Sequence, residues 1–125
     1  MEFVNFEISK KLKEKGFDEP CEMYYHIHDD IADCVGSLES TGGERNFVNS
    51  NNKYRCAAPT ISQVLKWLRE EKGIHIEIRL FSIGYGFDII QVTDRKKLAW
   101  SGTYEHDTYE QSALAGIVYV LDNLI

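Results

Sequence analysis

Two hydrophobic periods follow one another in the middle of the chain, and the change between them marks a helix that leads into a strand. The first set of apolar positions has the spacing of one helix face: Ile61, Val64, Leu65 and Leu68. Thr60 and Gln63 form a capping box, and Gly73 provides the left-handed residue on which many helices end. We therefore predict a helix over residues 60–72.

Strict alternation begins directly after this helix and predicts a strand with one buried face. Every second residue is a large aliphatic one: Ile74, Ile76, Ile78 and Leu80. Two more extended segments follow at residues 87–92 and 98–104, and residues 84–86 (GYG) suit the turn before them. Because links this short join neighbouring strands, the three segments favour an antiparallel meander.

Helices are also expected at both ends of the chain. Residues 5–15 carry an apolar stripe, and Gly16 followed by Phe17 repeats the glycine-then-apolar signal of a helix end. Residues 107–125 have a broad apolar face and open with acidic residues, which suit a first helical turn.

These elements together predict an α+β fold in a single domain, residues 1–125. We expect a mostly antiparallel sheet of three to four strands, made of the meander and joined by a strand at residues 22–28. The two helices at residues 60–72 and 107–125 are expected to cover one face, with the N-terminal helix at the side.

A long polar loop is predicted at about residues 37–58, with GGERNFVNSNNKYR at its centre. Loops of this length in a compact domain commonly have a function. Five of its residues combine cationic and aromatic groups that suit the docking of a partner: Arg45, Phe47, Lys53, Tyr54 and Arg55. We rank this loop as the best candidate binding surface; the plainer alternative is a solvated loop whose rings pack against the body.

Composition narrows the classes of partner. The 125 residues carry 14 Lys and Arg against 20 Asp and Glu, a formal charge of −6, which disfavours nucleic acid because such binders carry a clustered positive surplus. No run approaches the roughly 18 apolar residues of a membrane helix, and no signal-peptide pattern opens the chain, so we expect a cytoplasmic protein. Three cysteines without disulfide spacing are expected to be reduced.

The segment HIHDD at residues 26–30 is the sharpest candidate for a metal site. His26 and His28 share one face of the predicted strand, and a small zinc site could recruit Cys34, Cys56 or His75 as a further ligand; we name Cys34 with the two histidines. No C-x-x-C or H-x3-H spacing supports it, so two surface histidines are the competing interpretation. Cys56, which follows Arg55 and precedes a helix start, is the best placed thiol for nucleophilic chemistry. A buried, inert thiol is the commoner outcome, and we assign no catalytic residue and no cofactor.

The last helix has a flank of small residues, Ala113, Gly116 and Val120, that lets another backbone approach. Packing within the chain is the default interpretation, and a symmetric homodimer through this helix is the alternative.

Three stretches carry a resemblance that covers nearly the whole chain: GFDEPC at residues 16–21, CAAPTISQVLKWLREEKGIHI at 56–76 and YEQSALAGIVYVLDNLI at 109–125. They resemble a family of small uncharacterised proteins of Bacteroides-type genomes, often encoded among prophage or other mobile-element genes. The resemblance implies a bacterial, intracellular accessory protein. We expect a non-enzymatic protein-interaction module with a protein partner; the alternative is a small metal- or thiol-dependent enzyme using His26, His28 and a cysteine.

Overall fold

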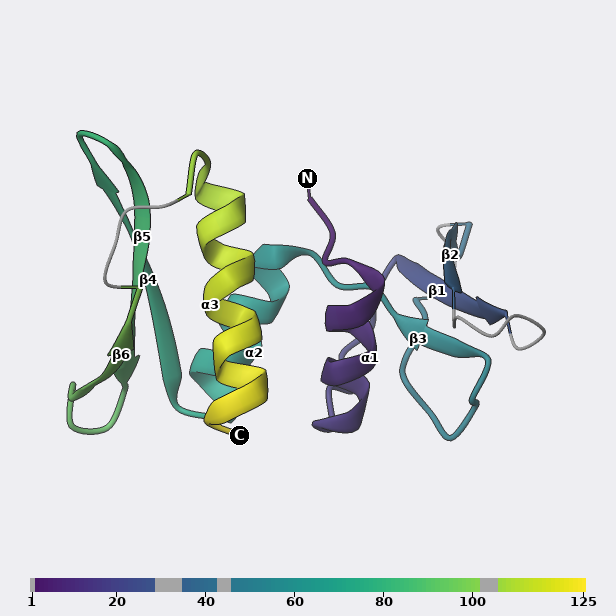
Figure 1. The fold of residues 1–125 in the computed structure, drawn as a ribbon. Helices are drawn as coiled ribbons and strands as arrows, with labels where there is room; N and C mark the ends of the chain where they lie inside the picture. The colour runs from purple at the N-terminus through teal and green to yellow at the C-terminus, as the bar shows by residue number, and fades with distance from the viewer. Residues whose placement is uncertain (1, 29–34, 43–45, 102–105) are drawn as a thin grey trace. The chain divides into compact units, whose positions relative to one another are not determined.

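A computed structural model describes residues 2–28, 35–42, 46–101 and 106–125. Within these residues it confirms the α+β prediction, with three helices and two antiparallel three-stranded sheets (Figure 1). The chain divides into two compact units at residues 60 and 61, which we call the N-terminal and the C-terminal unit.

The N-terminal unit combines one helix with a sheet of strand order β2-β1-β3. Its elements are α1 (Phe6–Glu14), β1 (Met23–His28), β2 (Val35–Ser40) and β3 (Arg55–Ala57). The predicted first helix is confirmed: the Asn5 side chain caps it by accepting a hydrogen bond from the Ile8 N–H at 2.9 Å. Gly16, with a φ of 89°, follows its end as predicted.

Alternation along β1, the central strand, divides the side chains of this sheet between two faces. The Tyr25 ring lies 5.5 Å from the ring of Phe6 on α1, and its β3 partner Cys56 is fully buried. Phe6 also packs on Gly36 of β2, where an added Cβ would come within 2.5 Å of the ring. This face is therefore covered by α1, and Tyr24 and His26, which point the other way, lie on the open face.

The polar stretch at residues 37–58 is not one loop. Its first residues complete β2 and its last contain β3, and neither strand follows from the sequence pattern. Between them, Phe47 pairs with Cys21 through two backbone hydrogen bonds of 2.8 Å. The Asn49 side chain donates to the Phe17 carbonyl at 2.9 Å and accepts from the Ala57 N–H at 2.8 Å. Its asparagines thus serve the backbone, which explains a polar composition without a period.

The C-terminal unit is the predicted meander, with strand order β4-β5-β6. Its elements are α2 (Ile61–Glu71), β4 (Ile74–Phe81), β5 (Gly84–Gln91), β6 (Lys97–Trp100) and α3 (Tyr109–Asn123). Both helices lie on the same side of the sheet (Figure 1). The sheet has three strands, the smaller number predicted, because residues 22–28 belong to β1 and pair with β2 and β3 instead.

The row of aliphatic residues on β4 forms the sheet side of this core only over part of its length. Ile74 and Ile76 are buried, whereas Leu80 at the other end of the strand is 69% exposed. The helices contribute the other side of the core: Val64, Trp67, Leu68, Ala113, Ile117, Val120 and Leu121. Alternation therefore identifies the face correctly, but how far the helices cover it depends on their placement.

The small-residue flank of α3 packs within the chain, as the default interpretation expects. Ala113, Gly116 and Val120 are all buried. A Cβ added at Gly116 would lie 2.9 Å from Ile76 Cγ2 and 3.4 Å from Phe87 Cγ. The sheet of the C-terminal unit therefore packs directly against this flank of α3, and no room is left at the flank for a second subunit.

Three local assignments differ from the sequence prediction. Residues 84–86 begin β5 instead of forming the turn, because Phe81 pairs with Gly84 and leaves a two-residue turn at Ser82 and Ile83. α3 begins at Tyr109 instead of residue 107: Thr108 is its N-cap, whose Oγ1 accepts from the Gln111 N–H at 3.1 Å, and Glu110 lies in the first turn as predicted. β6 ends at Trp100, and residues 102–105 of the predicted third strand lie outside the described residues.

We predict that Ile76→Asp unfolds the C-terminal unit, because it places a carboxylate in the core without a partner. The expected loss is roughly 4 kcal/mol or more in the free energy of unfolding, measured by urea denaturation. Ile83→Asp is the matched control, since Ile83 is 76% exposed. Equal stability of the two variants would show that Ile76 does not face the core.

Gly116→Leu is predicted to destabilise the protein by about 1–3 kcal/mol, because the side chain would overpack the contact with Ile76 and Phe87. Tyr119→Leu places the same residue at an exposed position of α3 and should have little effect. Urea denaturation of both variants tests the contact; a Gly116→Leu protein as stable as wild type would contradict it.

Candidate functional site

The open face of the N-terminal sheet gathers the polar and aromatic residues of four segments, and we call it the Tyr24 face. Its members are Tyr24, His26, Glu39, Phe47 and Arg55. Strand register places Glu39 of β2 opposite Tyr24, and Arg55 of β3 opposite His26. Since directly opposite residues of antiparallel strands share a face, the fold brings together side chains up to 31 positions apart in the chain, from Tyr24 to Arg55.

Tyr24 is the centre of this cluster. The Arg55 guanidinium carbon lies 5.2 Å from the centroid of its ring, within the range of a cation–π contact. The Phe47 ring lies 5.2 Å from it at an interplanar angle of 32°. The Glu39 carboxylate accepts a hydrogen bond from the Tyr24 hydroxyl, which raises the pKa of Tyr24. A cation, two rings and a carboxylate are therefore held in contact at the surface.

The segment that carries Arg55 is anchored to α1. The Lys13 amine donates to the Arg55 carbonyl at 2.9 Å and also to the Asn52 carbonyl. The Tyr54 carbonyl accepts from the Ile27 N–H at 2.7 Å, and the Tyr54 N–H donates to the Asn52 side chain at 2.8 Å. These bonds fix the backbone on which the candidate side chains stand, so the cluster is preorganised.

The structure brings together some of the five predicted binding residues and not others. Phe47 and Arg55 both contact Tyr24. Lys53 and Tyr54 form a second pair, with the amine 5.1 Å from the ring centroid and the ring 43% exposed. Arg45 lies outside the described residues.

Tyr24 and Glu39 are the two members of the cluster that the sequence analysis does not name. The period-2 pattern of residues 22–28 already places Tyr24 on the same face as His26. Glu39 carries no such signal, because β2 has no apolar alternation and its pairing with β1 is a tertiary fact.

The predicted metal site falls mostly outside the described part of the chain. His26 lies opposite Arg55, whose positive charge disfavours a cation nearby. The His28 side chain and Cys34 are not among the described residues. Within residues 2–28, 35–42, 46–101 and 106–125, no three His, Cys, Asp or Glu side chains are grouped to hold a metal ion. The site of His26, His28 and Cys34 stays a prediction.

Cys56 has the environment of a structural thiol. It is fully buried beside Tyr25, and burial raises its pKa to about 11, although Lys13 and Lys10 act in the opposite direction. The thiol is therefore protonated at neutral pH, whereas nucleophilic chemistry needs the thiolate. Cys21, the other described cysteine, is also buried.

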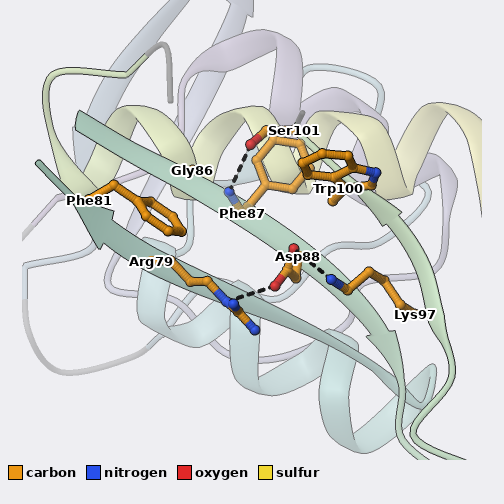
Figure 2. Close-up of a pocket in the computed structure, with 8 residues that line it drawn as sticks. All are labelled: Arg79, Phe81, Gly86, Phe87, Asp88, Lys97, Trp100 and Ser101. Atoms are coloured by element: carbon orange, nitrogen blue, oxygen red, sulfur yellow. Dashed lines mark hydrogen bonds and ion pairs between the residues drawn. The ribbon is translucent and has the colours of Figure 1, made fainter. Parts of the chain in front are cut away.

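A second feature, which the sequence analysis does not identify, lies on the C-terminal sheet. A hollow of about 120 Å³ lies beside Asp88 and is lined by residues of all three strands. Figure 2 shows its lining side chains. Asp88 is only 5% exposed, and its carboxylate forms ion pairs with Arg79 Nε at 2.7 Å and Lys97 Nζ at 3.5 Å. Trp100, opposite Asp88 on β6, is 60% exposed at the rim.

The Asp88 cluster supplies one charged residue from each strand: Arg79 from β4, Asp88 from β5 and Lys97 from β6. A buried carboxylate is tolerated when opposite charges compensate its lost hydration. Because both cations already neutralise Asp88, the cluster ties the three strands together and offers no unpaired base.

No protein-family model, curated protein or solved structure matches this chain. Of the helices that the structure describes, none has the length and apolar character needed to cross a bilayer.

We predict that iodoacetamide labels Cys56 at pH 7 about 100-fold more slowly than an ordinary thiol. The raised pKa lowers the thiolate fraction by this factor, since about 11 is two units above the usual 9.0. Labelling should accelerate as the pH rises toward 11 and when urea unfolds the chain. Peptide mapping by mass spectrometry separates Cys56 from the other cysteines; fast labelling in the native state at pH 7 would contradict the prediction.

Proposed function

We propose that this protein is a non-enzymatic protein-interaction module that binds a partner protein through the Tyr24 face. The observation that carries the proposal is the contact of Arg55 and Phe47 with Tyr24 on an open sheet face. In line with the resemblance noted above, we place it among the accessory proteins of a prophage or other mobile element, acting in the bacterial cytoplasm.

The residue types of the face support a protein partner. Tyrosine and arginine are the residues that most often dominate binding energy at protein interfaces, because they bury a large area and also form directional polar contacts. The backbone bonds of Phe47 and the Lys13 anchor hold the cluster before binding, which lowers the entropic cost of docking.

The charges of the face favour an acidic segment of the partner. Arg55 and Lys53 are exposed, and the described residues of the face include one carboxylate, Glu39, which is engaged with Tyr24. A guanidinium binds carboxylates through two parallel hydrogen bonds, so Arg55 is the expected point of contact.

The alternative is a small metal- or thiol-dependent enzyme using His26, His28 and a cysteine. It has less support, because Arg55 lies opposite His26 and because the raised pKa keeps the Cys56 thiol protonated.

A photo-crosslinking amino acid at His26, a member of the Tyr24 face, tests the proposal in a Bacteroides-type host. We expect it to capture one protein that the same group at the exposed Tyr119 of α3 does not capture. The purified partner should bind wild type and lose at least about tenfold in affinity for Arg55→Glu, a change that removes a buried charged contact. Arg69→Glu, an equal charge change on α2, is the control.

Identical capture from His26 and Tyr119, or equal affinity of Arg55→Glu and Arg69→Glu for the captured protein, would contradict the proposed face. Binding of a labelled single-stranded oligonucleotide that Arg55→Glu abolishes would contradict a protein partner and favour base stacking on the rings.

A further inference from the structure

The strand β4 forms an edge of the C-terminal sheet. In the order β4-β5-β6, β5 is its partner, and within the described part of the chain it pairs with no other strand. An edge strand presents unpaired backbone N–H and C=O groups that can hydrogen-bond to a strand of another molecule.

The hydrogen bonds of β5 identify which residues of β4 face this edge. The N–H groups of Gln91 and Tyr85 donate to Lys96 and His106, and the Phe87 carbonyl accepts from Ser101 at 2.9 Å. These three residues therefore point away from β4. Since opposite residues in such pairs both turn their backbone groups outward, their β4 partners face the edge: Ile74, Ile78 and Leu80. The backbone groups of Ile76 face the edge as well, because Ile76 lies two residues from both Ile74 and Ile78 on the same strand.

This edge lacks several of the features that usually prevent strand pairing: proline, lysine, a bulge and a short strand. β4 is eight residues long, pairs with β5 in unbroken register, and contains neither proline nor lysine. The opposite edge differs: β6 has four residues, begins with Lys97 and is interrupted by an irregularity at Ile89 and Ile90. Of the two edges of this sheet, as far as the structure describes it, β4 is therefore the one suited to regular pairing over a full strand length.

The sequence of β4 is complementary to itself in one antiparallel register. A twofold axis at Ile78 places Glu77 opposite the partner's Arg79, and Arg79 opposite the partner's Glu77. It also sets the edge-facing Ile76 against the edge-facing Leu80 of the partner subunit, so the hydrogen-bonding groups match. Opposite charges directly across a strand pair are stabilising.

Neighbouring registers are less favourable. An axis at Glu77 or at Arg79 would place two like charges opposite each other, which is destabilising. An axis at Ile76 would leave Leu80 beyond the paired segment, where it stays 69% exposed. Arg79 is held by Asp88 at 2.7 Å and lies 4.0 Å from Glu77 of the same strand, yet the side chains of Arg79 and Glu77 are 48% and 46% exposed, so their outer atoms can also contact the opposite charges of the partner subunit across the edge.

We propose that the protein forms a symmetric homodimer by antiparallel pairing of β4 with the partner's β4, centred on Ile78, to give a six-stranded sheet. We choose a second copy of the chain as the partner because β4 is complementary to an antiparallel copy of itself, both in its charges and in its edge-facing hydrogen-bonding groups. The proposal concerns the C-terminal unit and is independent of the Tyr24 face.

Multi-angle light scattering of the full chain after size-exclusion chromatography tests the proposal, at protein concentrations from about 1 to 100 µM. We expect wild type to reach twice the chain mass of 14.4 kDa. Leu80→Pro should be monomeric with an unchanged circular dichroism spectrum, because proline is tolerated where the N–H points away from the sheet. Glu77→Lys should weaken dimerisation at least about fivefold through two like-charge contacts, whereas Glu70→Lys, an equal charge change on α2, should not.

A monomeric wild type over the whole concentration range would overturn the proposal. So would a dimer that both Leu80→Pro and Glu77→Lys leave unchanged, because the interface would then lie elsewhere. A monomeric Leu80→Pro combined with equal dimerisation of Glu77→Lys and Glu70→Lys would refute the register centred on Ile78. If Leu80→Pro does not fold, the comparison of the two lysine variants decides.

Discussion

Helix cover on one face is the constraint on which both sheets depend. One helix in the N-terminal unit and two in the C-terminal unit cover one side of a three-stranded sheet, so alternate residues of each strand point toward the helices or toward the other face. At roughly 1.5–3 kcal/mol for each buried large apolar side chain, the covered faces outweigh any single polar contact in the molecule. Register follows from this preference, because a slip of one residue would move every buried side chain to the open side.

The polar side chains on the open faces of the two sheets have different surroundings. On the C-terminal sheet, Asp88 lies between cations from both neighbouring strands, and the charges are largely consumed within the cluster. On the N-terminal sheet, Tyr24 is contacted by a cation and a second ring whose outer surfaces remain available. The same physical element, a three-stranded open face, therefore serves cohesion in one unit and suits recognition in the other.

The candidate reactive and binding residues of the N-terminal unit are also divided between the covered face and the open face. Cys56 lies on the covered face, where burial keeps the thiol protonated. His26 and Arg55 lie on the open face, where they keep their polar groups near water. The side of β1 and β3 that a residue occupies thus decides whether its polar group is buried against α1 or lies on the open face.

Much of the fold was determined by the sequence alone. The apolar stripes and the glycines at positions 16 and 73 locate the first two helices to within a residue or two, because these signals act within one or two turns. The alternation of Ile74 and Ile76 identifies the buried face of β4 in the same way. Of the candidate site, the sequence indicates Phe47 and Arg55 by their residue type.

Strand pairing and the contacts of the Tyr24 face were decided only by tertiary structure, because they join segments that are far apart in the chain. Strands β2 and β3 have no apolar period of their own and exist because β1 supplies hydrogen-bonding partners on both sides. The strand at residues 22–28 could join either sheet by pattern, and only pairing assigns it to β2 and β3. The contacts of Tyr24 with Glu39, Phe47 and Arg55 join segments far apart in the chain. Local patterns carry no information about which strand will lie beside which, so this surface emerges only on folding.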